Sequence, residues 1–274
     1  MSTLIFTKAV ASGNDFIIID ARNKAARFNF KDLTKRLCHR TMGIGADGLL
    51  LLEKSKKADV RMRIFNADGS EAEMCGNGAR CVAYFVAQTK KNTVVIDTKA
   101  GIIKAQVRND TVQINMTQPR YVKIDFSLMI NQHALKVNFI NTGVPHVVIL
   151  CEDVNEIDVA RLGRLLRYHR RFQPAGTNIN FIEPKTLDEV KVRTYERGVE
   201  KETLACGTGS VASAIVYALK LKNTGLVKND NFSIFVDTAS GEQLKVNFNI
   251  VQDAIRNVFL EGKVKIICQG EYYA

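Results

Sequence analysis

Two cysteines of the chain stand in nearly identical short motifs, Cys75-Gly76-Asn77-Gly78 and Cys206-Gly207-Thr208-Gly209. Each motif follows a polar loop and precedes an apolar segment with helical character. The N-terminus of a helix carries unpaired N–H groups and the positive end of the dipole, so it favours the thiolate form of a cysteine there. The glycines let backbone N–H groups approach a bound anion closely. Each motif therefore predicts a base combined with a cradle for a carboxylate.

Two such thiols suit the inversion of a stereocentre, because one can remove a proton from a carbon while the other delivers a proton to the opposite face. A nucleophilic cysteine needs a base and an oxyanion hole around one thiol and does not use a symmetric pair. Two alternatives stay open: a buried cysteine beside a helix-entry turn, and a Cys75–Cys206 disulfide that joins the halves. The GIGADG segment at Gly43–Gly48 matches the dinucleotide-binding pattern only weakly, and we discount it.

The two motifs belong to an internal repeat with an offset of about 130 residues. Other segments match in the same order: Gly13 with Gly143, His39-Arg40 with His169-Arg170, Ala46–Glu53 with Gly176–Glu183, and Arg63–Phe65 with Arg193–Tyr195. The repeat predicts two similar halves that each supply one cysteine, with a boundary between Gln118 and Phe139. We place the domains at 1–125 and 126–274, with possible strand exchange from the C-terminus.

Apolar runs and their periods predict the elements that position the cysteines. In the first half, strands are expected at 4–6, 16–19, 49–52, 60–65, 94–97, 102–107 and 112–116, and helices over 30–40 and from near Gly78. In the second half, helices are expected over 159–171 and after Cys206. Strands dominate, with two helices per half. The pattern predicts an α+β fold of mostly antiparallel sheets wrapped around or against a helix.

The composition excludes several classes of protein. The chain has 274 residues, 46% of them hydrophobic, which is enough for a core and too apolar for a disordered protein. No run approaches the roughly 20 apolar residues of a membrane helix, and the N-terminus lacks the pattern of a signal peptide. We therefore expect a cytoplasmic protein with reduced thiols.

The remaining cysteines lack the CxxC pairs or Cys/His clusters of a zinc site. We assign all four to packing: Cys38, Cys81, Cys151 and Cys268.

The formal net charge of +11 admits one further class of function. Five arginines lie within 159–171, and an arginine-rich helix can track the phosphates of a nucleic acid. Only two aromatic residues, Tyr168 and Phe172, lie near them in the sequence. The arginines are Arg161, Arg164, Arg167, Arg170 and Arg171. We interpret the charge mainly as a solvated basic face, and expect neither a nucleic-acid nor a membrane partner.

The motifs together resemble the diaminopimelate epimerase family over nearly the whole chain. They are SGNDF (12–16), GIGADG (43–48), FNADGSEAEMCGNGARC (65–81), GVPH (143–146), GTNINF (176–181) and YERGVEKETLACGTGS (195–210). The resemblance implies two pseudo-symmetric halves, each a barrel-like, mostly antiparallel sheet around a central helix, with the active site in the cleft between them. It implies interconversion of LL- and meso-2,6-diaminopimelate without pyridoxal phosphate or metal, by a cytoplasmic homodimer, for lysine and peptidoglycan precursor synthesis.

The resemblance also implies roles for individual residues. Cys75 and Cys206 are the acid/base pair, and His146 and Glu196 modulate the pKa values of the two thiols. The Glu196 carboxylate suits an ammonium group, and the fork of the Arg197 guanidinium matches a carboxylate. The implied substrate-binding residues are Asn14, Asn66, Gly76, Asn77, Asn178, Glu196, Arg197, Gly207 and Thr208.

Ordinary structural roles stay open for several of these residues. Asn66 would then cap its turn, Asn178 would be a turn residue, His146 would be a core histidine, and Glu196 and Arg197 would form a surface pair.

The chain departs from the family pattern at two positions. Many members carry asparagine where this chain has Val144, and some carry glutamine where it has Gly48. Both changes remove side-chain contacts, so a racemase of another amino acid, such as histidine or proline, is the alternative. Arg197 and the complete NADGSE motif at 66–71 favour diaminopimelate.

Overall fold

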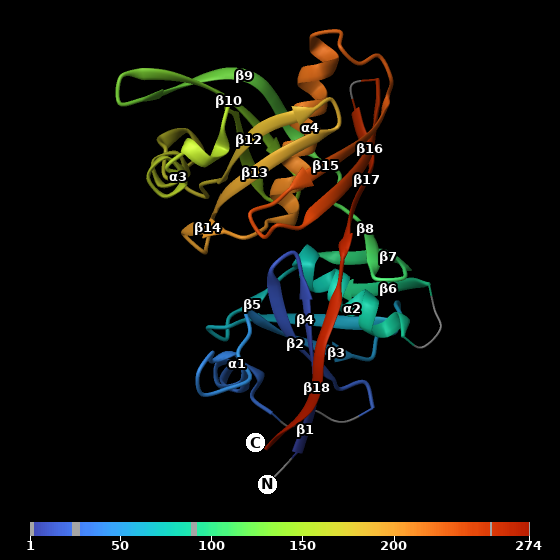
Figure 1. Ribbon diagram of the computed structural model, residues 1–274. Helices are drawn as coiled ribbons and strands as arrows, with labels where there is room; N and C mark the ends of the chain where they lie inside the picture. Colours follow the sequence, from blue (N-terminus) through green and yellow to red (C-terminus); the bar gives the residue numbers. More distant parts are fainter. Residues whose placement is uncertain (1–2, 24–27, 89–91, 253, 274) are drawn as a thin grey trace. The chain divides into compact units, whose positions relative to one another are not determined.

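The computed structural model describes residues 3–23, 28–88, 92–252 and 254–273. The chain divides into two compact units, shown in Figure 1. The first contains Met1–Asn115 and Glu261–Ala274, and the second contains Met116–Leu260. None of the helices among the described residues is long and apolar enough to cross a membrane.

The first unit is a mixed sheet packed on a helix. Its elements are β1 (Thr3–Ala11), β2 (Asn14–Asp20), α1 (Phe30–Cys38), β3 (Gly48–Glu53), β4 (Val60–Asn66), β5 (Glu71–Ala72), α2 (Gly76–Ala87), β6 (Thr93–Thr98), β7 (Gly101–Arg108), β8 (Thr111–Asn115) and β18 (Lys265–Tyr273). Strand β18 pairs antiparallel with β1, and the order continues through β2, β3, β4, β6, β7 and β8. Only the β2–β3 and β4–β6 pairs of this series are parallel. Helix α2 packs against β1, β2, β4, β6, β7 and β8.

The second unit repeats this arrangement. Its elements are β9 (Arg120–Ile130), β10 (His133–Asn141), β11 (Pro145–Leu150), η1 (Val154–Glu156), α3 (Val159–Arg167), η2 (Arg170–Phe172), β12 (Asn178–Thr186), β13 (Glu189–Glu196), β14 (Lys201–Thr203), α4 (Gly207–Asn223), β15 (Asn231–Asp237), β16 (Gln243–Val251) and β17 (Ala254–Lys263), which runs past Leu260. The strand order is β9, β10, β11, β12, β13, β15, β16, again with two parallel pairs, β11–β12 and β13–β15. Helix α4 packs against β10 to β13, β15 and β16. The predicted α+β fold of two pseudo-symmetric halves is confirmed.

The central helices are buried because they are apolar on nearly every side. In α4 each residue from Gly209 to Ala218 is buried, and in α2 each residue from Asn77 to Ala83 is buried. A helix without a polar face must be covered by other elements. The outer strands show the complementary pattern: in β7 the buried residues Ile103, Ala105 and Val107 alternate with exposed ones, so one face of the strand meets the core.

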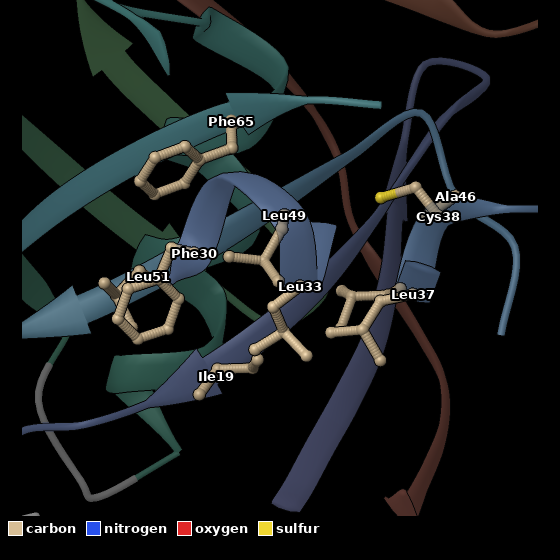
Figure 2. Close-up of a cluster of buried hydrophobic side chains, with 10 residues drawn as sticks. Ile19, Phe30, Leu33, Leu37, Cys38, Ala46, Leu49, Leu51 and Phe65 are labelled. Carbon is tan, nitrogen blue, oxygen red and sulfur yellow. The ribbon is translucent and has the colours of Figure 1, made fainter. Parts of the chain in front are cut away.

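Strand β3 is buried on both faces because a helix covers each of them. Leu49 and Leu51 point toward α1, where they join Leu33 and Leu37 in the cluster drawn in Figure 2. Leu50 lies on the other side of the strand, near Gly78 of α2. A strand covered on both faces needs a continuous apolar run, and Leu49–Leu52 provides one.

The second unit has an equivalent cluster beneath α3. Ile179 and Phe181 of β12 pack with Val159 of α3 and Tyr195 of β13. Gly163 permits the close approach of helix and strand, since a Cβ at this position would lie 2.5 Å from Cβ of Tyr195.

Several elements differ from the prediction. Helix α2 begins at Gly76, two residues before the predicted start, so that Cys75 itself is the N-cap residue. Helix α3 ends at Arg167 and is followed by the short 3-10 turn η2, because the His169 ring accepts the Arg171 N–H and separates the turn from the helix. Cys268 is not a packing residue, because it is exposed on β18.

Candidate active site

Cys75 lies at the N-terminus of α2, as its motif predicts. Its backbone is extended, with φ −144° and ψ 123°, and its carbonyl oxygen accepts the Ala79 N–H at 2.9 Å. The Gly78 N–H donates to the sulfur at a distance of 3.5 Å. The half-buried Sγ atom thus replaces the usual Ser or Asp oxygen of a helix cap, and it sits where the N–H groups and the helix dipole stabilise negative charge.

Cys206 occupies the same position in the second unit. Its φ of −123° and ψ of 111° are again extended, and its carbonyl oxygen accepts the Ser210 N–H at 2.8 Å. Its Sγ lies 3.5 Å from Oγ1 of Thr208. Cys206 is 8% exposed. Both thiols therefore stand at helix N-termini, and the hydroxyl group of Thr208 accompanies the second one.

The third residue after each cysteine is a glycine that packs closely against a strand. A Cβ on Gly78 would lie 3.0 Å from Cδ2 of Leu50, and a Cβ on Gly209 would lie 2.4 Å from Oδ1 of Asn180. The first turn of each helix thus presses directly on a strand. The backbone N–H groups at Gly76-Asn77 and Gly207-Thr208 belong to these first turns, and N–H groups at the start of a helix can donate hydrogen bonds to an anion.

A buried hydrogen-bond chain connects the first loop to Asn14. Nη2 of Arg80 donates to Oδ1 of Asn77 at 2.6 Å and to Oγ of Ser12 at 2.9 Å. Nδ2 of Asn77 then donates to Oδ1 of Asn14 at 2.5 Å, and Nδ2 of Asn14 donates to Asp47 at 3.1 Å. The Asn77 amide, which is only 3% exposed, is therefore used inside the protein, whereas the Asn14 amide is half-buried and lies nearer the surface.

Sequence reasoning missed Arg80, which is fully buried. The signal was present: a guanidinium group within a helix that is otherwise apolar on every side has to meet polar partners in the core.

Asn66 lies at the same edge of the sheet as Asn14. Gly48 pairs with Phe16 of β2 on one side and with Asn66 of β4 on the other. Asn66 is exposed, and its Nδ2 donates to Oγ of Ser70 at 3.0 Å within the turn. The structure therefore shows the hydrogen bond within the turn that a structural role of Asn66 predicts. It also leaves the amide oxygen of Asn66 at the surface.

The corresponding edge of the second unit holds His146 and Asn178, which pair across β11 and β12. Asn178 is 3% exposed and is the first residue of β12, not a turn residue. Its Nδ2 donates to the Pro145 carbonyl at 3.0 Å, and its Oδ1 accepts the Arg197 N–H at 2.9 Å. This amide holds the backbone that carries Arg197, and so it positions the guanidinium group.

Glu196 and Arg197 do not form a salt bridge with each other. The Glu196 carboxylate accepts a hydrogen bond from Oγ1 of Thr203 at 2.9 Å; burial raises its pKa, and the Thr203 contact opposes this rise only in part. Nη1 of Arg197 donates to the Ala175 carbonyl at 3.2 Å. Among the described residues no carboxylate pairs with Arg197, which leaves its charge available for a ligand.

His146 is fully buried, and the positive charge of Arg197 acts on its ring. Burial, helped by the positive charge of Arg197, lowers its pKa to about 3. The imidazole is therefore neutral at physiological pH.

The arginine-rich segment is partly structural. Nε of Arg167 donates to Glu200 at 3.1 Å while its guanidinium group lies over the Tyr168 ring, and Arg171 lies over the Phe126 ring. Within the described ranges, no group of three or more His, Cys, Asp and Glu side chains is arranged to hold a metal ion.

Comparison with known proteins gives consistent similarities. The family model described as diaminopimelate epimerase matches residues 6–122 and 138–267. A diaminopimelate epimerase of Aquifex aeolicus is 42% identical, with 97% of this chain and 96% of that protein covered. A diaminopimelate epimerase of Methanocella arvoryzae is 40% identical, with coverages of 99% and 97%.

Solved structures resemble the fold at lower identity. A PhzF-family phenazine biosynthesis protein of Bacillus anthracis matches over 100% of both chains, with a TM-score of 0.76 and 17% identity. A hydroxyproline epimerase of Agrobacterium vitis matches over 98% of this chain and 92% of its own, with a TM-score of 0.68 and 17% identity.

Proposed function

Because the chain belongs to the diaminopimelate epimerase family and is therefore an isomerase, we propose that it interconverts LL- and meso-2,6-diaminopimelate with a pair of cysteine thiols and no cofactor. One observation carries this proposal. Each unit places a cysteine as the N-cap residue of its buried central helix, at equivalent positions of the repeat.

Cys75 and Cys206 act as base and acid in turn. In one direction, one thiolate takes the α-proton, so that a C–H bond breaks, an S–H bond forms and the electron pair stays on the substrate. The other thiol then gives its proton to the opposite face of that carbon and becomes a thiolate. The roles exchange in the reverse direction. The net charge of the pair is the same before and after the reaction, and the starting state returns when the first thiol releases its proton to solvent and the second thiolate takes one up. A helix N-terminus assists each thiolate.

The first turns of α2 and α4 support the same step. Loss of the α-proton sends negative charge onto the adjacent carboxylate, and fixed N–H donors lower the energy of that state. The backbone N–H groups at Gly76-Asn77 and Gly207-Thr208 are such donors. Because the helices are buried along their length, the donors do not have to reorganise during the reaction.

Charged and amide groups select the substrate. Arg197 has no carboxylate partner among the described residues, and its planar fork matches a carboxylate in two hydrogen bonds. Glu196 provides the opposite charge for an ammonium group, and such a cation would lower the raised pKa of this carboxyl. Asn14 and Asn66 add amide contacts. Diaminopimelate has a second carboxylate for Arg197, whereas histidine and proline have only one carboxylate.

We place this reaction in the cytoplasm, in the supply of meso-diaminopimelate for lysine and peptidoglycan precursors. Reducing conditions there keep the reacting thiols available. We also propose a homodimer. Three large apolar side chains, Ile5, Ile267 and Tyr273, are exposed on the paired strands β1 and β18, and a second copy would cover them.

Incubation with LL-diaminopimelate in D₂O tests the proposal, with NMR and mass spectrometry following the α-carbon. We expect deuterium to enter during formation of the meso epimer. Cys75→Ala and Cys206→Ala are each expected to abolish epimerisation, whereas the matched variant Cys268→Ala, at an exposed cysteine outside both motifs, keeps it. Epimerisation by the Cys75→Ala/Cys206→Ala double variant would disprove the two-thiol mechanism. Turnover of histidine or proline without turnover of diaminopimelate would refute the proposal that diaminopimelate is the substrate.

A further inference from the structure

The two units differ beneath their equivalent helix N-termini. In the first unit, the positions below α2 hold apolar side chains, Leu50 and Ile64, next to Phe16. The repeat places polar residues at the corresponding positions of the second unit: His146 for Phe16, Asn180 for Leu50 and Thr194 for Ile64. All three polar residues are at most 3% exposed. A buried polar group that replaces an apolar one reduces stability unless it is hydrogen-bonded, so this trio needs a specific reason.

The orientation of the Asn180 amide is fixed by its neighbours. Nδ2 lies 3.0 Å from the carbonyl oxygen of Val147, which can only accept a hydrogen bond. Oδ1 accepts a hydrogen bond from Oγ1 of Thr194 at 3.0 Å. A rotated amide would place two oxygens in contact at Val147 and lose that bond, whereas the Thr194 hydroxyl can donate or accept and fits either orientation.

The second hydrogen of the Asn180 amide then determines the tautomer of His146. Nδ2 of Asn180 lies 3.1 Å from Nδ1 of the imidazole. Because Nδ2 carries only hydrogens, Nδ1 has to accept, and an imidazole that accepts at Nδ1 carries its proton on Nε2. The neutral charge state follows independently from burial and from the neighbouring positive charge of Arg197.

Nε2 of His146 is buried and has no hydrogen-bond partner among the described residues. We propose that Asn180 is a positioning residue that fixes His146 as the Nε2–H tautomer, so that the ring serves the reaction as a hydrogen-bond donor to an anionic group and not as a base. The anionic group is a thiolate or a substrate carboxylate, which share this chemistry. The role in the reaction rests on the proposed function, whereas the tautomer does not depend on it.

The test reads the protonation of each ring nitrogen in the full-length protein. The chain has only four histidines, and two-bond ¹H–¹⁵N correlation spectra of ¹⁵N-histidine-labelled protein distinguish the tautomers. A His146→Gln variant identifies the signals of His146. We expect a protonated Nε2 and an unprotonated Nδ1 from pH 6 to pH 8. A protonated Nδ1, or an imidazolium, in the unmodified protein overturns the proposal.

Two variants at Asn180 sharpen the test. Asn180→Leu copies the residue at the equivalent position of the first unit and removes the donor, so a mixture of tautomers is expected. Asn180→Asp puts a carboxylate oxygen opposite Nδ1, which is expected to draw the proton to that nitrogen. If both variants keep the tautomer of the unmodified protein, Asn180 does not position the ring.

Steady-state kinetics then distinguish between the candidate anionic groups that accept the hydrogen bond from His146. Asn180→Leu is expected to lower the rate of epimerisation about 10- to 100-fold, by analogy with the loss of the partner that orients a metal-bound histidine. A loss mainly in kcat assigns the donor to a group whose negative charge changes during the reaction, which is a thiolate or the reacting carboxylate, and a loss mainly through KM assigns it to the distal carboxylate of the substrate. Unchanged kinetics in a variant whose tautomer has changed would remove His146 from the reaction, even if the thiol pair were correct.

Discussion

The hydroxyl of Thr203 donates a hydrogen bond of 2.9 Å to Oε2 of Glu196, a carboxyl whose pKa is raised by burial. The contact connects β14 to the end of β13 and favours the charged form of the acid. It therefore sets how readily the proposed ammonium-binding group ionises.

Thr203→Val is expected to raise the pKa of Glu196 further, because it removes the group that opposes the effect of burial. An acid whose pKa is higher in the folded than in the unfolded state adds to stability below its ordinary value of 4.5, and this contribution is lost as pH rises through the folded value. In Thr203→Val, where the pKa of Glu196 is higher, this loss of stability extends to higher pH. Urea unfolding at several pH values measures it, with Thr203→Ser as the matched control. Identical pH profiles for both variants would show that the hydroxyl does not act on Glu196.

Gly209→Ala is expected to reduce both stability and activity more than Gly78→Ala. A Cβ at residue 209 would lie 2.4 Å from Oδ1 of Asn180 and 3.3 Å from Sγ of Cys206, whereas at residue 78 it would meet the flexible end of Leu50 at 3.0 Å. Overpacking of this kind costs about 1–3 kcal/mol, and alanine returns up to about 1 kcal/mol through its helix propensity. Chemical denaturation and steady-state rates of both variants provide the comparison; equal losses would contradict the difference in packing.

Arg80→Met is expected to lower stability by about 1–3 kcal/mol, because Asn77 and Ser12 keep their buried polar groups and lose the donor. Asn77 and Asn14 should also lose their fixed orientation, which raises KM for the substrate. The control is Arg22→Met, which breaks a salt bridge with Asp20 that is open to solvent and is expected to cost at most about 1 kcal/mol. The prediction fails if Arg80→Met binds substrate normally.

Restoring the family residue is expected to affect stability differently at the two positions where the chain departs from the family pattern. Gly48→Gln should destabilise the protein, since a Cβ there would lie 2.7 Å from the backbone oxygen of Phe65 on the neighbouring strand. Gly48→Ala is the control that separates the Cβ contact from the longer side chain. Val144→Asn lies in a half-buried turn between β10 and β11 and should leave the unfolding free energy unchanged within about 0.5 kcal/mol. Thermal unfolding of the three variants tests this order.

The sequence predicts the fold well because its main signals are local or repeated. Leu49–Leu52 and the alternation of Ile103, Ala105 and Val107 identify strands, and the repeated CGxG motifs locate the helix N-termini. The candidate site is predicted less completely. The Asn77 and Asn178 amides are used within the protein, and that follows from contacts with Arg80 and with the Pro145 carbonyl that no spacing reveals.

Other features depend on which residues meet in three dimensions. The donor role of Asn180 requires its distance to a carbonyl group on another strand, although the repeat already aligns Asn180 with Leu50 and marks the change in polarity. Cys268 is exposed although it shares a face of β18 with the half-buried Gly270 and Tyr272, which the composition of the strand does not indicate.

The pairing of β1 with β18 has a consequence for the order of events during synthesis. Translation delivers the first half of the chain before the second, yet the strand that completes the first unit is made from residues 265–273. The second unit is therefore fully available to fold while a nascent first unit still exposes the free edge of β1. The part of the protein that leaves the ribosome first is completed last, and a premature stop near codon 264 would leave that edge permanently open.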